Sequence, residues 1–320
     1  MTSKKDTTSG YYTIAFYNLE NLFDTFDNKH THDDDFLPSS EKKWTQKRYK
    51  KKVRKLGYAI SEIGIKTSKK LPVIVGLAEV ENKLVVEDLL DSKFLEHKNY
   101  DLVHYDSADE RGIDVALIYN KDYFKVEHTE VFPLDLFDEN GFRDYTRDIL
   151  LVTGYLNNEK IHILVNHWPS RRAGEQETEA ARLTASNKVI EIFNSIKEED
   201  SNAKIIIMGD FNDDPSNKSI KQLVNTLDIY NPMESLKSIL RGSLNHRQNW
   251  NLFDQILFST NFFEYQPHKH SFSKANIFDN QFLKQFKGKY RGNPFRTYVG
   301  YKYKGGYSDH FPVYIHLKKN

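Results

Sequence analysis

The sequence has no cysteine among its 320 residues, which excludes disulfides, thiolate metal sites and cysteine nucleophiles. It also lacks an excess of one charge, since 46 basic and 45 acidic residues leave a formal net charge of +1. Bulk charge therefore gives no argument for a nucleic-acid or membrane partner. The amino terminus, MTSKKDTTSGYY, has no apolar run, so we expect neither a signal peptide nor a membrane span. The chain as written is predicted to be cytoplasmic, although a chain whose leader had been removed would look the same.

The length sets the expected domain organisation. A chain of 320 residues can bury a large core, and no shift in composition marks a boundary between two domains. We expect residues 1–10 to form a disordered tail and residues 11–320 to form one domain. Nothing in the sequence indicates a stable protein partner.

The most informative stretch runs from Lys204 to Pro215 and reads KIIIMGDFNDDP. Its apolar part is typical of a fully buried strand, and Gly209 is predicted to mark the strand's end. Asp210 and Asn212 then lie at the carboxyl end of this strand, where α/β folds usually build their sites. A carboxylate beside an amide suits a hard metal ion or a phosphate oxygen. The same residue types also form ordinary turns, so this stretch alone favours a site and a turn equally.

Other apolar runs also end in polar side chains. The polar residues at predicted strand ends are Asn18, Glu20, Glu79, Asn166, His167, Arg171, Asp309 and His310, and Arg147 precedes a further strand. Asp254 lies inside the short apolar strand 252–259, and a buried carboxylate commonly orients a histidine. The set includes no serine, cysteine or lysine nucleophile with a base beside it. It fits metal-assisted attack of water on a phosphoester.

The remaining periodicity predicts the other elements. We expect strands over 12–17, 73–78 and 101–105, a strand in ERGIDVALIYN, a hairpin with arms 149–156 and 160–165, a last strand after SDH, and helices over 85–95, 178–197 and 220–227. An amphipathic helix carries Tyr49, Val53 and Leu56 on one face, with its basic residues mainly on the wet side. Residues 131–145 are predicted to be a looser connection.

Two polar segments have more than one interpretation. His30, His32 and Asp33 lie in a cluster that is predicted to be a solvated acidic loop rather than a metal site, because no periodicity places them on one face. Residues 261–306 alternate basic and aromatic side chains. That composition suits a phosphate backbone and its bases, an anionic lipid headgroup, or a long loop packed by its own aromatics.

Taken together, the motifs resemble those of a known family. NLEN, LAEVEN, RGIDVAL, NHWPSR, GDFNDDP and SDHFPV follow the order found in the endonuclease/exonuclease/phosphatase superfamily, the metal-dependent phosphoesterases related to deoxyribonuclease I. NHWPSR and the ending RTYVGYKYKGGYSDH are most similar to bacterial members. The resemblance implies an α/β fold in which two β-sheets pack face to face with helices on both outer sides. It also implies that the domain over residues 11–320 is catalytic.

The resemblance further implies a metal site. Glu79 resembles the family's principal metal ligand, and Asp309 with Asn18 or Glu20 would complete the surroundings of the ion, directly or through water. Mg²⁺ is the expected ion, with Mn²⁺ as its substitute, because carboxylate, amide and water oxygens suit hard cations.

Catalytic roles follow from the same resemblance. Asp210 resembles the group that positions or deprotonates the attacking water, while Asn212 and His167 would contact the phosphate or stabilise its transition state. His310, oriented by Asp254, resembles the imidazole on the scissile phosphate, with its role as base or electrostatic stabiliser left open. On the substrate side the predicted residues are Arg147, Arg171 and Asn166.

Three functions remain open from the sequence. The first is a nuclease that cleaves DNA or RNA, and the second is a phosphatase or phospholipid phosphodiesterase acting on inositol phosphates or sphingomyelin. The third is a binding protein that keeps the fold without the chemistry. Residues 261–306 and the acidic loop do not match deoxyribonuclease I itself, which leaves DNA specificity undecided.

Overall fold

The computed structural model describes residues 10–137, 140–172 and 174–320. The predicted disordered tail thus lies, except for Gly10, outside the described residues. The chain builds two six-stranded sheets. Sheet A contains, in spatial order, β15 (His270–Ile277), β18 (Val313–Lys319), β1 (Tyr11–Leu22), β2 (Ile74–Val80), β4 (Asp114–Asn120) and β3 (Tyr100–His104). Sheet B contains β11 (Ile229–Tyr230), β14 (Asp254–Ser259), β10 (Lys204–Asp210), β9 (Glu159–His167), β8 (Ile149–Leu156) and β5 (Phe124–Phe132).

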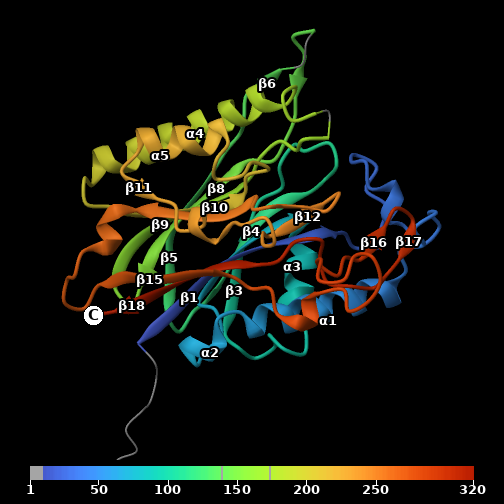
Figure 1. Cartoon of the computed structure of the whole chain (residues 1–320), viewed down its shortest axis with the longest axis horizontal. Coiled ribbons are helices and arrows are strands. Elements are labelled where there is room, and N and C mark those ends of the chain that lie inside the picture. Colours follow the sequence, from blue (N-terminus) through green and yellow to red (C-terminus); the bar gives the residue numbers. More distant parts are fainter. Residues whose placement is uncertain (1–9, 138–139, 173) are drawn as a thin grey trace, which may run out of the picture.

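Helices cover both outer sides of the sheet pair. In the described residues the α-helices are α1 (Gln46–Glu62), α2 (Ile65–Ser68), α3 (Lys83–Leu90), α4 (Glu179–Glu199) and α5 (Lys218–Thr226). Short two-stranded sheets are formed by β6 (Leu136–Phe137) with β7 (Arg143–Asp144), by β12 (Leu244–His246) with β13 (Asn249–Asn251), and by β16 (Tyr298–Val299) with β17 (Lys302–Tyr303). Figure 1 shows α4 and α5 above sheet B and the helices α1 to α3 below sheet A. The expected four-layer α/β sandwich is therefore confirmed. Within the described ranges, no helix is both long and apolar enough to cross a membrane.

The two sheets pack through a continuous apolar core. Residues of β1 and β2 such as Phe16 and Ile74 are fully buried, as is Met208 of β10. Gly76 of β2 has no room for a side chain, because a Cβ there would lie 2.5 Å from the sulfur of Met208. A second cluster, which includes Val189, fills the space between sheet B and the helices α4 and α5. Packing on both faces explains why the central strand β10 of sheet B reads as an unbroken apolar run.

Strand β10 differs from the sequence prediction at Gly209. We expected the strand to stop there, but β10 continues to Asp210, which lies opposite Asp254 of β14. Gly209 pairs with Asn166 of the parallel strand β9, and a Cβ at this glycine would collide with the Asn166 carbonyl. The glycine is therefore required by a close approach of two backbones rather than by a turn.

Several other elements differ from the sequence predictions. Helix α3 ends at Leu90 rather than Leu95, and it starts where the Asn82 side chain accepts the Val85 N–H at 3.1 Å. Strand β5 lies in a region where no strand was predicted, and β15 adds an edge strand to sheet A from within residues 261–306. Both segments are strands because each pairs with a neighbouring strand, and such long-range pairing leaves little local signal in the sequence.

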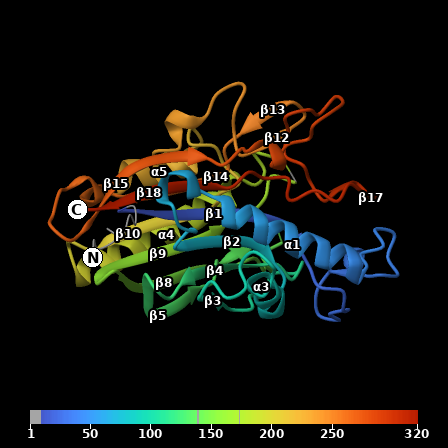
Figure 2. The same ribbon diagram turned by 90° about the horizontal axis from the view of Figure 1, so that it is seen from below.

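Helix α1 covers sheet A, as Figure 2 shows. Its apolar stripe is buried as predicted at Tyr49, Val53 and Leu56. Lys52 was assigned to the wet side with the other basic residues, and this was wrong, because it is only 2% exposed. It lies three residues after Tyr49 and four before Leu56, which places it on the buried face.

Candidate active site

Strand ends from both sheets meet at one end of the sandwich. Strands β1 and β2 run parallel in sheet A, and β9 and β10 run parallel in sheet B, so their carboxyl ends lie together. The β1–β2 and β2–β4 pairings both shift register near their ends, around Glu20 and at Glu79. Glu20, Glu79 and Asn212 have positive φ angles of 52°, 60° and 49°. Such backbone conformations are uncommon outside glycine and cluster at functional sites, where bulges re-aim side chains.

His310 and Asp254 form the centre of the site. His310 Nδ1 lies 2.7 Å from Asp254 Oδ2 and 3.9 Å from Asp210 Oδ2. Asp254 is fully buried and Asp210 is 2% exposed. The structure thus brings together the imidazole and the carboxylate that the sequence paired, with a second carboxylate beside them.

Hydrogen bonds hold the Asp210 carboxylate from two directions. The Asn18 amide donates to Oδ2 at 2.9 Å, and the backbone N–H of Asn212 donates to Oδ1 at 3.0 Å. The Asn212 side chain donates to the Trp168 carbonyl at 2.9 Å. The positive φ at Asn212 therefore orients Asp210, and Asn18 ties sheet A to sheet B at this point.

The buried charges shift the pKa values of this group in opposite directions. Burial, followed by Asp254, raises the pKa of Asp210 to about 7, against the opposing effects of His310, the Asn212 N–H and the Asn18 amide. Burial by itself would lower the pKa of His310, but Asp254 and Asp210 raise it well above its usual value. His310 is therefore held as an imidazolium, while Asp210 can exchange a proton near neutral pH.

A second group of acidic residues gathers next to this centre. Burial and the nearby Asp309 raise the pKa of Glu20 to about 7, and Glu79 lies 4.0 Å from His167 Nε2 through its Oε1. The Arg296 guanidinium lies 2.5 Å from Asp309 Oδ2 and 3.6 Å from Glu20 Oε1.

The side chains of this acidic group are of the kind that binds a divalent cation. Its donors are carboxylate oxygens of Glu20, Glu79 and Asp309 with the amide oxygen of Asn18, which is a hard, all-oxygen set. Glu20 and Asp309 repel each other, and Arg296 already places a positive charge against both. The accumulated negative charge is what a bound divalent cation would offset.

His167 faces the arginines of a neighbouring cleft. Its Nε2 lies 4.0 Å from Asp210 Oδ2. Burial, followed by Arg147 and Arg111, lowers the pKa of His167 well below its usual value, so the ring is neutral. Arg147 donates to Asp109 and to the Trp168 carbonyl, both at 2.9 Å. Arg111, Arg147 and Arg172 line a cleft of about 660 Å³.

Two residues predicted to contact substrate have other surroundings. Asn166 is fully buried, its amide donates to backbone carbonyls, and its oxygen accepts the indole N–H of Trp168 at 3.1 Å. Arg171 is held by the Asn212 carbonyl and by Asp213, both at 2.6 Å. Both therefore support the loop after β10. The second arginine of NHWPSRR, Arg172, is the one that lines the cleft.

Four residues that contact the site were given no role in it from the sequence, namely Lys52, Arg111, Arg296 and Thr297. Lys52 donates to the Glu20 carbonyl and, at 2.7 Å, to Thr297, whose own N–H donates to Glu20 at 2.5 Å. Arg111 reaches Asn21 at 2.6 Å. Only Lys52 had a readable signal, namely its place on the apolar stripe of α1. The positions of Arg111, Thr297 and Arg296 depend on how distant segments meet.

Comparison with known proteins shows the family of this chain. The chain matches the model of the Endonuclease/Exonuclease/phosphatase family over residues 13–319. It belongs to this family. Members are hydrolases of phosphoester bonds that generally use a divalent metal ion, which supports phosphoesterase chemistry here. No curated protein sequence matches the chain.

Solved structures share the fold at low sequence identity. An endonuclease/exonuclease/phosphatase family protein from Bacteroides thetaiotaomicron is 16% identical, with a TM-score of 0.61 over 97% of this chain and 95% of that one. The mannosyl-6-phosphatase Bt3783 of the same organism is 16% identical, with a TM-score of 0.58 over 96% of this chain and 99% of that one. A humanised TDP2 of D. rerio is 14% identical, with a TM-score of 0.59 over 97% of this chain and all (100%) of that one. These likenesses establish the fold alone.

Proposed function

We propose that this family member is a metal-dependent phosphodiesterase that cleaves DNA or RNA by in-line attack of water, with residues 11–320 acting as one catalytic unit. The observation that carries the proposal is the buried group of His310, Asp254 and Asp210 beside the acidic group of Glu79 and Asp309. An imidazolium, a carboxylate that titrates near neutral pH and a hard-cation site can each assist phosphoester hydrolysis.

Each of these side chains has a separate role in the proposed reaction. Asp210, positioned by Asn18 and Asn212, accepts the proton of the attacking water. His310, kept protonated by Asp254, donates a hydrogen bond to a nonbridging oxygen and stabilises the charge that develops in the transition state. A cation held by Glu79, Asp309 and Asn18 or Glu20 would polarise the phosphate and offset charge on the leaving oxygen.

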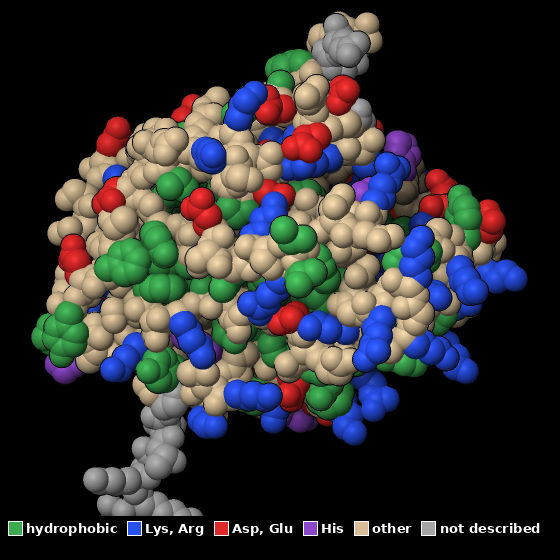
Figure 3. Space-filling view, viewed as in Figure 1, with side chains coloured by type: hydrophobic (Ala, Val, Ile, Leu, Met, Phe, Trp, Pro, Cys, Tyr) green, Lys and Arg blue, Asp and Glu red, His purple; other side chains and the backbone are tan. Residues whose placement is uncertain are grey.

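A basic aromatic surface beside the site favours a nucleic-acid substrate. Lysine and arginine side chains gather on the side of the molecule where Figure 1 places α1, β16 and β17, as Figure 3 shows. Arg48 lies 4.3 Å from the Tyr303 ring centre and Lys55 lies 4.5 Å from that of Tyr307. Tyr290 and Tyr301 are about half exposed, at 47% and 53%. Cations that follow a backbone and rings that stack on bases are how proteins bind single strands.

Cleavage of supercoiled plasmid by the purified protein with Mg²⁺ or Mn²⁺ tests the proposal. We expect the parent to nick the plasmid and Asp210→Asn to lose activity by about 10³–10⁴-fold, because proton transfer and positioning of water are both lost. The variant also controls for contaminating nucleases, and a circular-dichroism melt checks that it is folded. Retention of most activity by Asp210→Asn would overturn the assignment.

The arginine-lined cleft favours a second candidate, a phosphatase or phospholipid phosphodiesterase. Arg111, Arg147 and Arg172 would hold a compact phosphorylated group beside His167. The same two preparations can be assayed on inositol phosphates and sphingomyelin, and on RNA to complete the nucleic-acid arm. Hydrolysis of an inositol phosphate or of sphingomyelin by the parent, with plasmid and RNA left intact, would replace the nuclease by this second candidate.

A further inference from the structure

A second cluster of metal-ligating side chains lies beside the site, where β3 leaves sheet A and β4 returns to it. His104 is the last residue of β3, Asp114 is the first of β4, and Asp106 lies between them. One ligand atom from each lies within 4.8 Å of the others. His104 Nε2 is 3.3 Å from Asp114 Oδ2.

The histidine of this cluster is buried without a hydrogen bond at Nε2. The His104 side chain is 2% exposed, and its Nε2 finds no hydrogen-bond partner among the described residues. A buried polar atom left in this way is costly, and native structures contain few of them. The 3.3 Å distance to Asp114 equals the spacing of two ligands around a tetrahedral ion with bonds of about 2.0–2.1 Å.

Hydrogen bonds fix the orientation of the Asp114 carboxylate. Its Oδ1 accepts the N–H of Ser107 at 3.0 Å and the Ser107 hydroxyl at 2.5 Å, which leaves Oδ2 directed at His104. Outer hydrogen bonds of this kind fix the orientation of metal ligands. Asp148, the residue before β8 of sheet B, lines a small cleft with Asp114, and burial followed by Asp114 raises the pKa of Asp148. A cation would offset both carboxylates.

We propose that His104, Asp106 and Asp114 bind a divalent transition-metal ion, separate from the cation at Glu79 and Asp309. One imidazole nitrogen with two carboxylates suits Zn²⁺ better than Mg²⁺ or Ca²⁺, which prefer all-oxygen surroundings. Asp106 Oδ1 lies 3.9 Å from the other ring nitrogen of His104, Nδ1, so the site needs the Asp106 side chain, which is 84% exposed, to turn toward Nε2 and Asp114.

The ion would act on the arginine-lined cleft. Asp106 and Asp114 bracket a connection that carries Asp109, the partner of Arg147, and Arg111. A metal ion bound to both ends closes this connection, and it thereby limits the positions that the two guanidinium groups can take. The site is therefore structural, holding phosphate-binding residues in place without touching the reacting atoms.

Calorimetric titration of the full chain with Zn²⁺, in excess Mg²⁺ to occupy the all-oxygen site, tests the proposal. We expect one Zn²⁺ to bind each parent chain, and we expect this binding to be lost in His104→Asn. In Asp106→Asn, whose exposed position leaves folding intact, we expect the affinity for Zn²⁺ to be at least about tenfold weaker. His128→Asn is the matched control, because His128 is 60% exposed and lies 3.6 Å from Glu130. No Zn²⁺ binding by the parent, or equal binding by parent and His104→Asn, would overturn the site.

Hydrogen exchange supplies a readout that is independent of turnover. We expect Zn²⁺ to slow amide exchange in residues 105–113 of the parent and to leave it unchanged in Asp106→Asn. Zinc binding without this protection would overturn the structural role. Because neither measurement uses substrate, both outcomes are separate from the test of the phosphodiesterase.

Discussion

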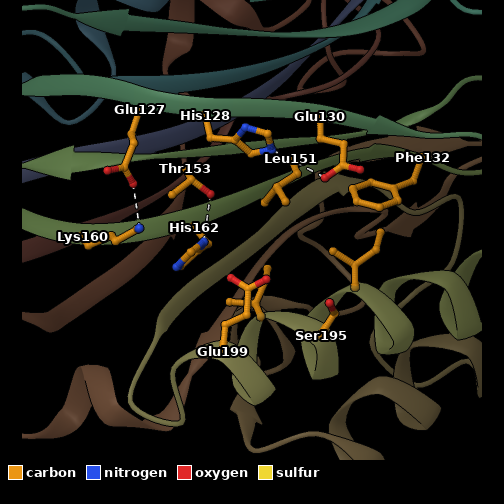
Figure 4. A pocket seen from close by; sticks show the side chains of 12 residues that line it. Glu127, His128, Glu130, Phe132, Leu151, Thr153, Lys160, His162, Ser195 and Glu199 are labelled. Atoms are coloured by element: carbon orange, nitrogen blue, oxygen red, sulfur yellow. Dashed lines mark hydrogen bonds and ion pairs between the residues drawn. The ribbon is translucent and has the colours of Figure 1, made fainter.

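Sheet B carries histidines and carboxylates in two places, with opposite consequences. At its strand ends, the buried Asp210 and Asp254 converge with His310, which precedes β18 of sheet A. On its outer face, a pocket of about 440 Å³ opens under α4 and is lined by His128, His162, Glu127, Glu130, Lys160 and Glu199. Figure 4 shows Glu127 paired with Lys160 and His128 paired with Glu130 along the wall, rather than all pointing to one centre.

One buried histidine from each place shows the difference most clearly. His162 hydrogen-bonds to the neutral hydroxyl of Thr153 at 2.9 Å, so burial dominates and lowers its pKa to about 4. His310 is also buried, but its partner is the carboxylate of Asp254, and its pKa rises instead. The partner, rather than the histidine or its burial, therefore decides whether the ring is a cation at neutral pH.

An ion pair in the pocket and one beside the site also differ in how far they are buried. Lys160 and Glu127 lie 2.6 Å apart in the pocket with 46% and 40% of their side chains exposed, whereas Arg147 and Asp109 are 7% and 4% exposed. A list of titratable residues is therefore a poor guide to a site. Burial with a charged partner perturbs protonation, and perturbed groups in a cleft are the better indicator of function.

The largest effect is expected from removing the charge on the partner of His310. Asp254→Asn keeps the shape of the side chain but lets the pKa of His310 fall, and we expect kcat to drop about 10³-fold, or about 4 kcal/mol. Titration of the imidazole by NMR and steady-state kinetics measure both changes. Thr153→Val, which removes the partner of His162, is the control and should leave kcat unchanged. Equal kcat in parent and Asp254→Asn would contradict the role of the pair.

The next effect comes from breaking the buried ion pair. Arg147→Ala leaves Asp109 buried without its partner, and we expect the free energy of unfolding to fall by about 3 kcal/mol. Lys160→Ala breaks the exposed pair and should cause no measurable change. Urea denaturation of both variants makes the comparison, and equal losses would show that burial does not separate the two pairs.

A smaller effect concerns pH and His162. Its folded pKa of about 4 lies below the usual value of about 6.5, so between these limits the unfolded chain binds a proton that the folded chain does not. Stability from the neutral ring is complete above pH 6.5 and is lost as the pH falls toward 4. Partial exposure limits the loss to about 2 kcal/mol. His162→Gln should flatten this part of the stability curve, and an unchanged curve would contradict the assignment.

The smallest effect is expected at the exposed wall of the pocket. His128→Ala with Glu130→Ala removes an exposed pair, with side chains 60% and 51% accessible. We expect kcat to be unchanged and unfolding to shift by less than about 0.5 kcal/mol. A clear loss of turnover would show that the pocket under α4 takes part in the reaction.

Much of the fold could be predicted from local patterns. The apolar runs that became β1, β2 and β10, the hairpin of β8 and β9, and the helices α1 and α4 all have strong periodicity or length. Strands β5 and β15 could not be predicted, because they exist through pairing at sheet edges. Gly209 was misinterpreted as a strand end, because its role depends on the backbone of Asn166 in a strand more than forty residues away.

The sequence by itself determined which groups occupy the strand ends, since side-chain chemistry does not depend on the fold. It placed a carboxylate after each of two buried strands, and its motif order indicated the family. Only the tertiary structure decided that Arg172 rather than Arg171 faces the cleft, that Asn166 is a buried support, and that Arg296 and Lys52 reach the acidic group. The reason is that a charge acts on its neighbours in space, and the neighbours of these residues lie far from them along the chain.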